Sequence, residues 1–320
     1  MSRCEYFLTD YLYKYGNFDA SAVKTTYVIE GYFDNMNFTA KNLDASTSMK
    51  NTRTETSYHD LSKKTRTWEF IICPTFGFLG SPEPLMKDCE LKLSFDRSHP
   101  YTSVIASTKV DPKALSTPIV INDCVAITEY VSSPSLRSFF DHIEYEPIMY
   151  EYDACDVLIK NIPNNETEVR FENIRGGNVP LAMFAGVISQ SCLQGDRLNS
   201  STLFKNFDVE EMNFSLNGSS VNGYPITIKH GNPFLPMQKF FDTSGRYYNV
   251  ASGDGLSALE FKWNFLWAHK FEAENASQGW LGINLKLKKA FTNNMCLVVW
   301  IISPTATALD KFHKIERINL

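Results

Sequence analysis

The side chains with the greatest capacity for chemistry are carboxylates, imidazoles and thiols, and their spacing builds no familiar reaction centre. Asp208, Glu210 and Glu211 form the densest carboxylate group, and paired carboxylates are what general acid–base chemistry requires. They flank a run in which apolar and polar residues alternate, so we predict that they form the solvated face of a strand. No catalytic residue is assigned.

The histidines and cysteines do not form a metal site. No two histidines stand three or four residues apart, the spacing at which one helix face presents two imidazoles to zinc, and no two cysteines have the CxxC spacing. Cys73 precedes a proline and has no evident base partner, which disfavours a nucleophile. We therefore expect the seven cysteines to be free, mostly buried thiols, with no metal and no cofactor.

The common catalytic motifs are also absent from the sequence. The chain contains no GxSxG, HExxH, GxxxxGKS/T or GxGxxG. We therefore expect that the protein is not an enzyme, and an enzyme on a β-sandwich ranks third among the function classes considered.

The residues around the carboxylate group predict a strand. Met212, Phe214 and Leu216 alternate with polar neighbours, which is the period of a strand with one buried face. Phe207 and Val209 lie in the opposite phase, which indicates a β-bulge or the beginning of the strand. We expect Phe207 and residues 212, 214 and 216 to be buried.

Two Asn-Gly pairs predict where this strand turns into a hairpin. Asn217-Gly218 ends the alternation, and Asn222-Gly223 precedes its return at Tyr224, Ile226 and Ile228. Asn and Gly tolerate the positive φ that tight turns need. The tip of the hairpin is predicted to run from Asn217 to Gly223.

Length and composition favour two β-rich domains. The chain has 320 residues, more than one core usually supports, and 43% are hydrophobic, with 23 Phe and 15 Tyr. Short strands joined by turn clusters are typical of sandwiches and jelly rolls, so we predict an all-β fold of two jelly-roll domains. Besides residues 212–216 and 224–228, strands are predicted at residues 23–29, 68–73, 89–95, 119–131, 149–152, 156–159, 167–171, 183–188, 261–267, 280–287 and 295–302.

Two short helices interrupt this pattern. The first covers Glu5–Gly16, and the second covers Pro134–Glu146, where Ser133 resembles an N-cap followed by proline at the first helical position. We predict a first domain at residues 1–133, a connecting helix at residues 134–146 and a second domain at residues 147–320.

Charge and hydropathy bear on partners and location. The formal net charge of -5 disfavours a specific nucleic-acid reader. The longest apolar run near the end, Met295–Ile302, is eight residues long, whereas a membrane helix needs about 20, so no membrane span is expected. No apolar signal segment precedes the Asn-X-Ser/Thr acceptors, so we expect an intracellular protein that is not secreted.

Two parts of the sequence resemble the C-terminal domain of a known family. They are the stretch Leu203–Gly218, which reads LFxxFDVxxxxFxLNG, and the ending Asn293–Asn319. This family comprises the hexon-like double jelly-roll major capsid proteins of Polinton/Maverick elements and adintoviruses. There, a "KHFDI"-type phrase leads into a strand that turns at Asp-Gly or Asn-Gly. Here, Asn206–Val209 matches the phrase, Asn217-Gly218 matches the turn, and Ile315–Arg317 falls in the closing tail.

The first half is similar to the same family over shorter stretches. Glu5–Gly16 resembles a segment inside the family's first jelly roll, and Trp68–Val104 resembles its paired strands after a long loop. If so, the first jelly roll lacks its N-terminal strands, and we expect the chain alone to associate or to be poorly soluble because sheet edges stay open. The resemblance implies a homotrimeric, pseudo-hexagonal capsomer in a virion, contacts with a penton-type minor capsid protein, and no catalytic residue.

A carbohydrate-binding, lectin-like jelly roll is the alternative, because one fold serves both functions. Exposed aromatic rings would stack on sugars, and the candidates are Tyr224, Tyr247, Tyr248 and Trp280.

Overall fold

The computed structural model describes residues 8, 9, 11, 12, 121, 123–127, 132–134, 147–196, 199, 201–228, 231–245, 261, 265–271, 278–310 and 315–319. Most of the predicted first domain lies outside these residues, as does most of the predicted connecting helix. Pro134 is helical, at the position where that helix is predicted to begin. The division into domains stays a prediction.

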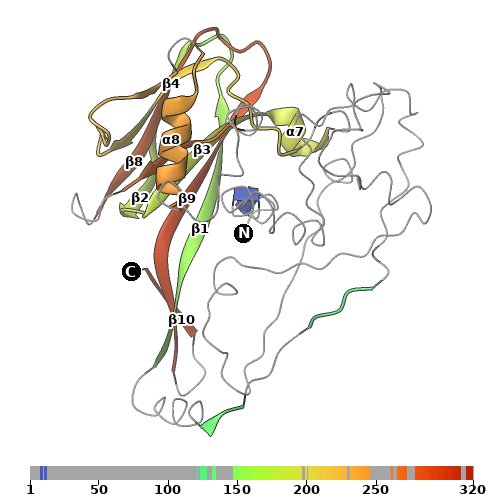
Figure 1. Ribbon diagram of the computed structural model, residues 1–320, viewed down its shortest axis with the longest axis vertical. Helices are drawn as coiled ribbons and strands as arrows, with labels where there is room; N and C mark the ends of the chain where they lie inside the picture. Colours follow the sequence, from blue (N-terminus) through green and yellow to red (C-terminus); the bar gives the residue numbers. More distant parts are fainter. Residues whose placement is uncertain are drawn as a thin grey trace.

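The second half of the chain forms two antiparallel sheets of five strands each (Figure 1). In the first sheet the order is β1 (Ile148–Ile162), β9 (Met295–Leu309), β3 (Ala182–Ser189) and β7 (Trp267–Lys270), and β10 (Ile315–Asn319) also pairs with β9. In the second sheet the order is β2 (Glu168–Asn178), β8 (Gln278–Leu287), β4 (Val209–Leu216) and β5 (Ser219–Ser220), and β6 (Ile226–Thr227) also pairs with β4.

The strand order is that of a jelly roll. β5 and β6 pair with the same edge of β4 and together act as one interrupted strand. Counted in this way along the chain, the eight strands from β1 to β9 are ordered 1-8-3-6 in one sheet and 2-7-4-5 in the other. The chain thus crosses repeatedly between the two sheets, as in an eight-stranded double-sheet jelly roll. The described part is therefore mostly β, with few helices, while a second jelly roll stays a prediction.

The core lies between the two sheets and extends over the far side of the first. His269 of β7 pairs with Met183 of β3, and its ring stacks on Phe214 of β4 with 6.0 Å between centroids, so this face of the first sheet meets the second sheet. Phe184 and Trp300 are also register partners, and since successive residues of a strand point to opposite faces, they lie on the other face. Every residue of β3 except the last is buried, because both faces of that strand are covered.

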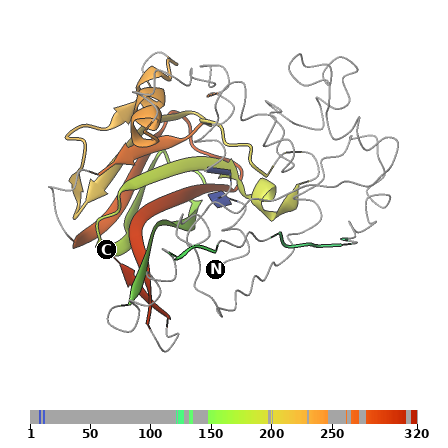
Figure 2. The same cartoon turned by 60° about the horizontal axis from the view of Figure 1, so that its bottom comes forward.

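A six-residue helix, α7 (Gln190–Gly195), follows β3, and a longer one, α8 (Phe234–Thr243), lies between β6 and β7. Asn232 Oδ1 accepts the Phe234 N–H at 3.1 Å at the start of α8, and Gly245 follows its end with a φ of 74°. Phe240 of α8 packs edge-on against Phe184, with ring centroids 5.9 Å apart. In the tilted view of Figure 2, α8 (orange) and α7 (yellow-green) lie on different sides of the strands.

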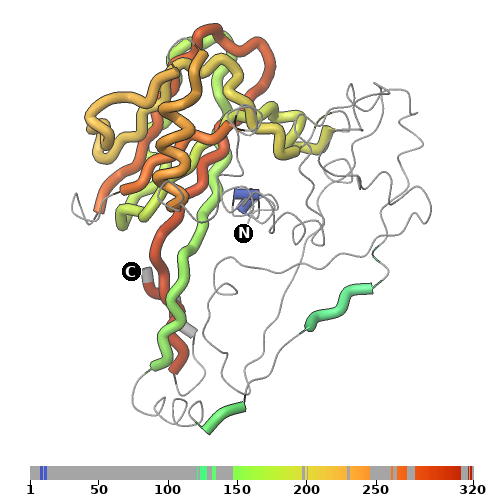
Figure 3. Tube along the Cα trace, in the orientation of Figure 1, coloured from blue at the N-terminus to red at the C-terminus, as the bar shows by residue number. Residues whose placement is uncertain are grey.

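β1 and β9 continue past the end of β3 as a long ribbon (Figure 3). They pair over their whole length, from Ile148 opposite Leu309 to Ile162 opposite Met295. β3 pairs with β9 only up to Ile302, and β10 pairs with β9 from Thr305 to Leu309. The ribbon beyond the sandwich therefore consists of three strands.

Several predicted strands are confirmed, and most are longer than the sequence pattern indicates. The two strands predicted at residues 149–152 and 156–159 are parts of one strand, β1. The strand predicted at residues 167–171 runs on to Asn178 as β2, and the strand predicted at 295–302 runs on to Leu309 as β9. Each strand continues past the end of its apolar–polar alternation because its backbone keeps pairing with a long neighbouring strand.

Two strand predictions are wrong in the residues that can be described. Residues 121 and 123–127 are not in a strand, and Ile121, Val125 and Ile127 are 70%, 74% and 81% exposed. Phe261 is helical, and the strand predicted from it begins only at Trp267. Alternating apolar residues make a strand only when a neighbouring strand is there to pair with them.

Candidate functional sites

The carboxylate group lies at a β-bulge, as the phase change in the sequence predicts. Val209 pairs with Leu287 and Glu211 pairs with Lys286, so Glu210 is the extra residue on β4. The backbone before it is twisted into positive φ, at 47° in Phe207 and 61° in Asp208. Asp208 and Glu210 are exposed, which places them on the solvated face rather than in a reaction centre.

The predicted hairpin turns earlier than expected. Asn217 and Gly218 alone make the turn, with φ values of 53° and 80°, and Ser219 already pairs with Leu216. The seven residues from Ser220 to Ile226 then face only four on β4, from Ser215 to Met212, so the return strand is interrupted. The second Asn-Gly pair lies within this interruption, and Gly223 has a φ of 68°. Met212 and Phe214 are buried as predicted, whereas Phe207 and Leu216 are half-buried.

Trp280 is the most prominent aromatic side chain beside this turn. Its ring is 57% exposed and lies over Gly176, its register partner on β2. A Cβ added to Gly176 would come within 2.6 Å of the ring, so only glycine leaves the space that this ring fills. Of the other candidate sugar-stacking residues, Tyr224 is 55% exposed, and Tyr247 and Tyr248 lie outside the described residues.

One polar cluster joins the two sheets. Arg175 of β2 donates to Ser303 Oγ at 2.9 Å and forms an ion pair with Asp156 of β1 at 3.2 Å. A bulge between Phe171 and Arg175 precedes this contact. Arg175 is therefore a strand residue that bridges the two sheets.

Among the described residues, His269 is the only histidine, and it sits in an apolar site. Phe271 meets its ring edge-on at 4.7 Å, and Phe214 stacks on it. Burial, and then the positive charge of Lys239, lower the pKa of His269 to about 4, while Asp242 opposes this effect. The imidazole is therefore neutral at physiological pH, as expected for a core residue.

The described thiols are free, as predicted, but two of the four are not buried. Cys192 and Cys296 are buried, Cys155 is half-buried and Cys124 is exposed. Burial raises the pKa of Cys192 to about 11, which makes its thiolate scarce and its nucleophilicity low. No group of three or more metal-ligating side chains occurs in the described part of the chain.

A long-range contact ties the beginning of the chain to the second half. The Trp300 Nε1–H of β9 donates to the Leu8 carbonyl at 2.8 Å. Tyr11 packs on Phe204 and Trp300, with centroid distances of 5.2 and 6.4 Å, and Leu12 is buried in the same core. The sequence places this helical segment in the first domain, but its apolar face is part of the core of the second half.

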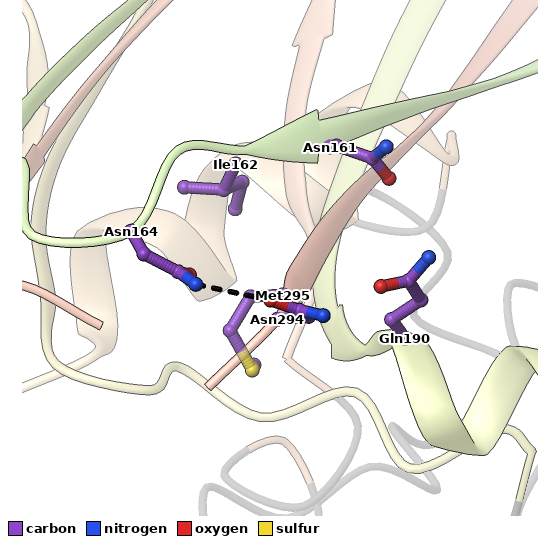
Figure 4. Close-up of a pocket in the computed structure, with 6 residues that line it drawn as sticks. All are labelled: Asn161, Ile162, Asn164, Gln190, Asn294 and Met295. Carbon is purple, nitrogen blue, oxygen red and sulfur yellow. Dashed lines mark hydrogen bonds between the residues drawn. The ribbon is translucent and has the colours of Figure 1, made fainter. Parts of the chain in front are cut away.

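A small hollow opens where strands β1 and β9 reach the end of the sandwich (Figure 4). Its volume is about 270 Å³. On one side, Asn164 Nδ2 donates to Asn294 Oδ1 at 3.0 Å. The lining residues are Asn161, Ile162, Asn164, Gln190, Asn294 and Met295. Sequence spacing does not reveal this group, because its members come from three separate stretches of the chain.

No described helix has the length and apolar character needed to cross a membrane. No family model matches the chain, and no curated protein matches it. Among solved structures, the chain is similar to the mavirus major capsid protein, with 10% sequence identity and a TM-score of 0.30. The match covers 54% of this chain and 42% of that one, so it spans less than half of the mavirus protein.

Proposed function

We propose that this protein is a structural capsid subunit of the hexon-like type, from a virus-like or transposon-encoded particle. The observation that carries the proposal is the position of the stretch Leu203–Gly218, whose sequence resembles the capsid family. It forms the approach to β4, the bulge at Glu210, the buried strand and the Asn217-Gly218 turn. The family-like residues thus coincide with a central strand of a jelly roll, a fold that capsid proteins use.

The further features of this proposal come from the resemblance. The subunit would form a homotrimer with a pseudo-hexagonal outline, contact neighbouring capsomers and a penton-type minor protein, and reside in the virion. It would have no catalytic residue and no cofactor, since its work is to pack against copies of itself.

The oligomeric state of the purified full-length chain tests the proposal. Size-exclusion chromatography with light scattering should give a species of about 109 kDa, three times the 36.4 kDa of one chain, and electron microscopy should show rings or shells. A monodisperse monomer at micromolar concentration would contradict the capsid function.

Carbohydrate binding is the second candidate, and one observation favours it. Trp280 presents an exposed indole that lies over Gly176, and an exposed aromatic ring is what stacking on a sugar requires. A glycan array probed with the natural chain and with Trp280→Ala tests it: binding that the substitution abolishes supports a lectin, and an array without signal rejects it.

A further inference from the structure

The hollow at the end of β1 and β9 joins three parts of the chain that the jelly-roll topology brings together. Asn161 and Ile162 end β1, Gln190 begins α7, and Asn294 and Met295 lead into β9. The Gln190 N–H donates to the Asn294 carbonyl at 3.0 Å, which fixes α7 against the start of β9. The walls of the hollow are therefore attached to the ends of paired strands rather than to a long loop.

The polar groups of the hollow are neutral amides. None of its six lining residues carries a charge, and four of them are Asn or Gln. Asn161 Oδ1 accepts a hydrogen bond from the Cys296 thiol at 3.3 Å. The Nδ2 group of the same amide can therefore donate to a ligand. The Gln190 side-chain amide makes no hydrogen bond to any described residue. In Figure 4 the Asn164 amide lies on one side of Asn294, and the Asn161 and Gln190 amides lie on the other.

These groups select among ligand classes. A phosphate or carboxylate would require a cationic side chain or a set of converging N–H groups, and the lining has no Lys, Arg or His. Amide oxygens can take part in the coordination of a cation such as Ca²⁺, but a metal site in a protein also uses carboxylate, imidazole or thiolate ligands, which the lining lacks. A neutral ligand rich in hydroxyl groups fits, since each hydroxyl both donates and accepts and each amide offers both functions.

The size of the hollow and the burial of its two apolar lining residues narrow the class of ligand further. A volume of about 270 Å³ is the share of roughly nine liquid waters, just below the range of pockets for drug-sized ligands. The hollow therefore has room for one small ligand ring. Ile162 and Met295 are buried, so the four amides supply most of the surface that a ligand in the hollow would contact.

We propose that this amide-lined hollow, formed by Asn161, Gln190, Asn164 and Asn294 over Ile162 and Met295, binds a single neutral sugar unit of a glycan. The site is separate from Trp280 and does not depend on the capsid function. One hollow would bind weakly, with millimolar affinity, and repetition of the site on an assembly would raise the avidity.

Saturation-transfer difference NMR on the full-length chain tests the proposal. The probes are the methyl glycosides of glucose, galactose and N-acetylglucosamine, with sialic acid and inorganic phosphate as charged comparisons. At least one neutral glycoside should give a transfer signal. Gln190→Ala, which breaks no hydrogen bond to a described side chain, should reduce that signal at least fivefold, and Gln190→Glu should do the same without loss of volume.

Two matched variants locate the binding. Gln278→Ala removes an exposed glutamine from the beginning of β8 and should leave the signal unchanged. Trp280→Ala separates the hollow from the indole surface: a signal that Trp280→Ala abolishes and Gln190→Ala leaves intact would place the sugar on the tryptophan and overturn the proposal. It is equally overturned if no neutral glycoside gives a signal, if only the charged probes do, or if Gln190→Ala alters self-association instead of sugar binding.

Discussion

Asn217 and Trp280 are joined by two reciprocal hydrogen bonds. The Trp280 N–H donates to Asn217 Oδ1 at 2.9 Å, and the Asn217 N–H donates to the Trp280 carbonyl at 2.8 Å. This reciprocal pair fastens the β4–β5 turn to the beginning of β8, just beyond the register pair of Leu216 and Leu281. An asparagine suits the position twice, since it tolerates the φ of 53° and its side chain closes the second hydrogen bond.

Replacing Asn217 should therefore separate the two effects. We expect Asn217→Ala to lower the free energy of unfolding by about 1–2 kcal/mol. The substitution removes a hydrogen bond, and it leaves alanine, which has no side-chain amide, in a backbone conformation with positive φ. Asn217→Gly loses the bond but not the conformational fit, so it should cost less. Urea unfolding measures both, and equal losses would show that φ plays no part.

Phe214 should be among the most costly core residues to truncate. It is fully buried, and its ring stacks on His269 between the sheets. We expect Phe214→Ala to cost about 3–5 kcal/mol because the cavity between two sheets cannot collapse. Phe234→Ala is the control, since that ring is 63% exposed. Similar small losses in both variants would mean that the two sheets do not enclose Phe214.

Stability should fall on acidification because of His269. Its folded pKa, about 4, lies below the unfolded value of 6.5, so the folded state prefers the neutral imidazole. The contribution is fully present above pH 6.5 and is lost as the pH falls from 6.5 through 4, a loss that approaches about 3 kcal/mol below pH 4.

A comparison with His269→Phe isolates this effect from the carboxylates that titrate in the same range. The unfolding free energy of the natural chain should decline more steeply between pH 6.5 and 4 than that of the variant. Parallel curves would show that His269 is accessible to protons in the folded state.

The contact between Trp300 and Leu8 predicts that the second half depends on the N-terminal segment. Trp300→Phe removes the buried hydrogen bond to the Leu8 carbonyl, which should cost about 1–3 kcal/mol, and the loss of one of the two indole rings adds to this cost. Leu8→Ala should cost about 2–5 kcal/mol, since that side chain is fully buried.

A fragment of residues 147–320 checks the same relationship from the other side. We expect it to bind a hydrophobic dye more strongly than the full chain does, because Phe204 and Trp300 lose the cover of Leu8 and Tyr11. A fragment with full near-ultraviolet circular dichroism and no dye binding would show that the jelly roll is complete without residues 8–12.

The sequence alone determines the local features of this fold. Alternation at Met212, Phe214 and Leu216 indicates which face of β4 is buried, and the change of phase at Glu210 indicates the bulge. The Asn217-Gly218 pair indicates the turn. Each of these depends on neighbouring residues and on allowed φ and ψ angles, so a short stretch contains all the necessary information. Helix α8 is not among the elements predicted from the sequence, although Asn232 before it and Gly245 after it are typical of helix ends.

Only the tertiary structure decides which segments meet. Leu8 and Trp300 are 292 residues apart, and Asn164 and Asn294 are 130 apart, so no local pattern connects them. Residues 121 and 123–127 show the converse, since their apolar alternation stays exposed where no strand pairs with it. Alternation reports that a face is apolar but not what covers it, because covering requires loop closure and packing between distant elements. The hollow, the Arg175 bridge and the site of His269 all arise at that level.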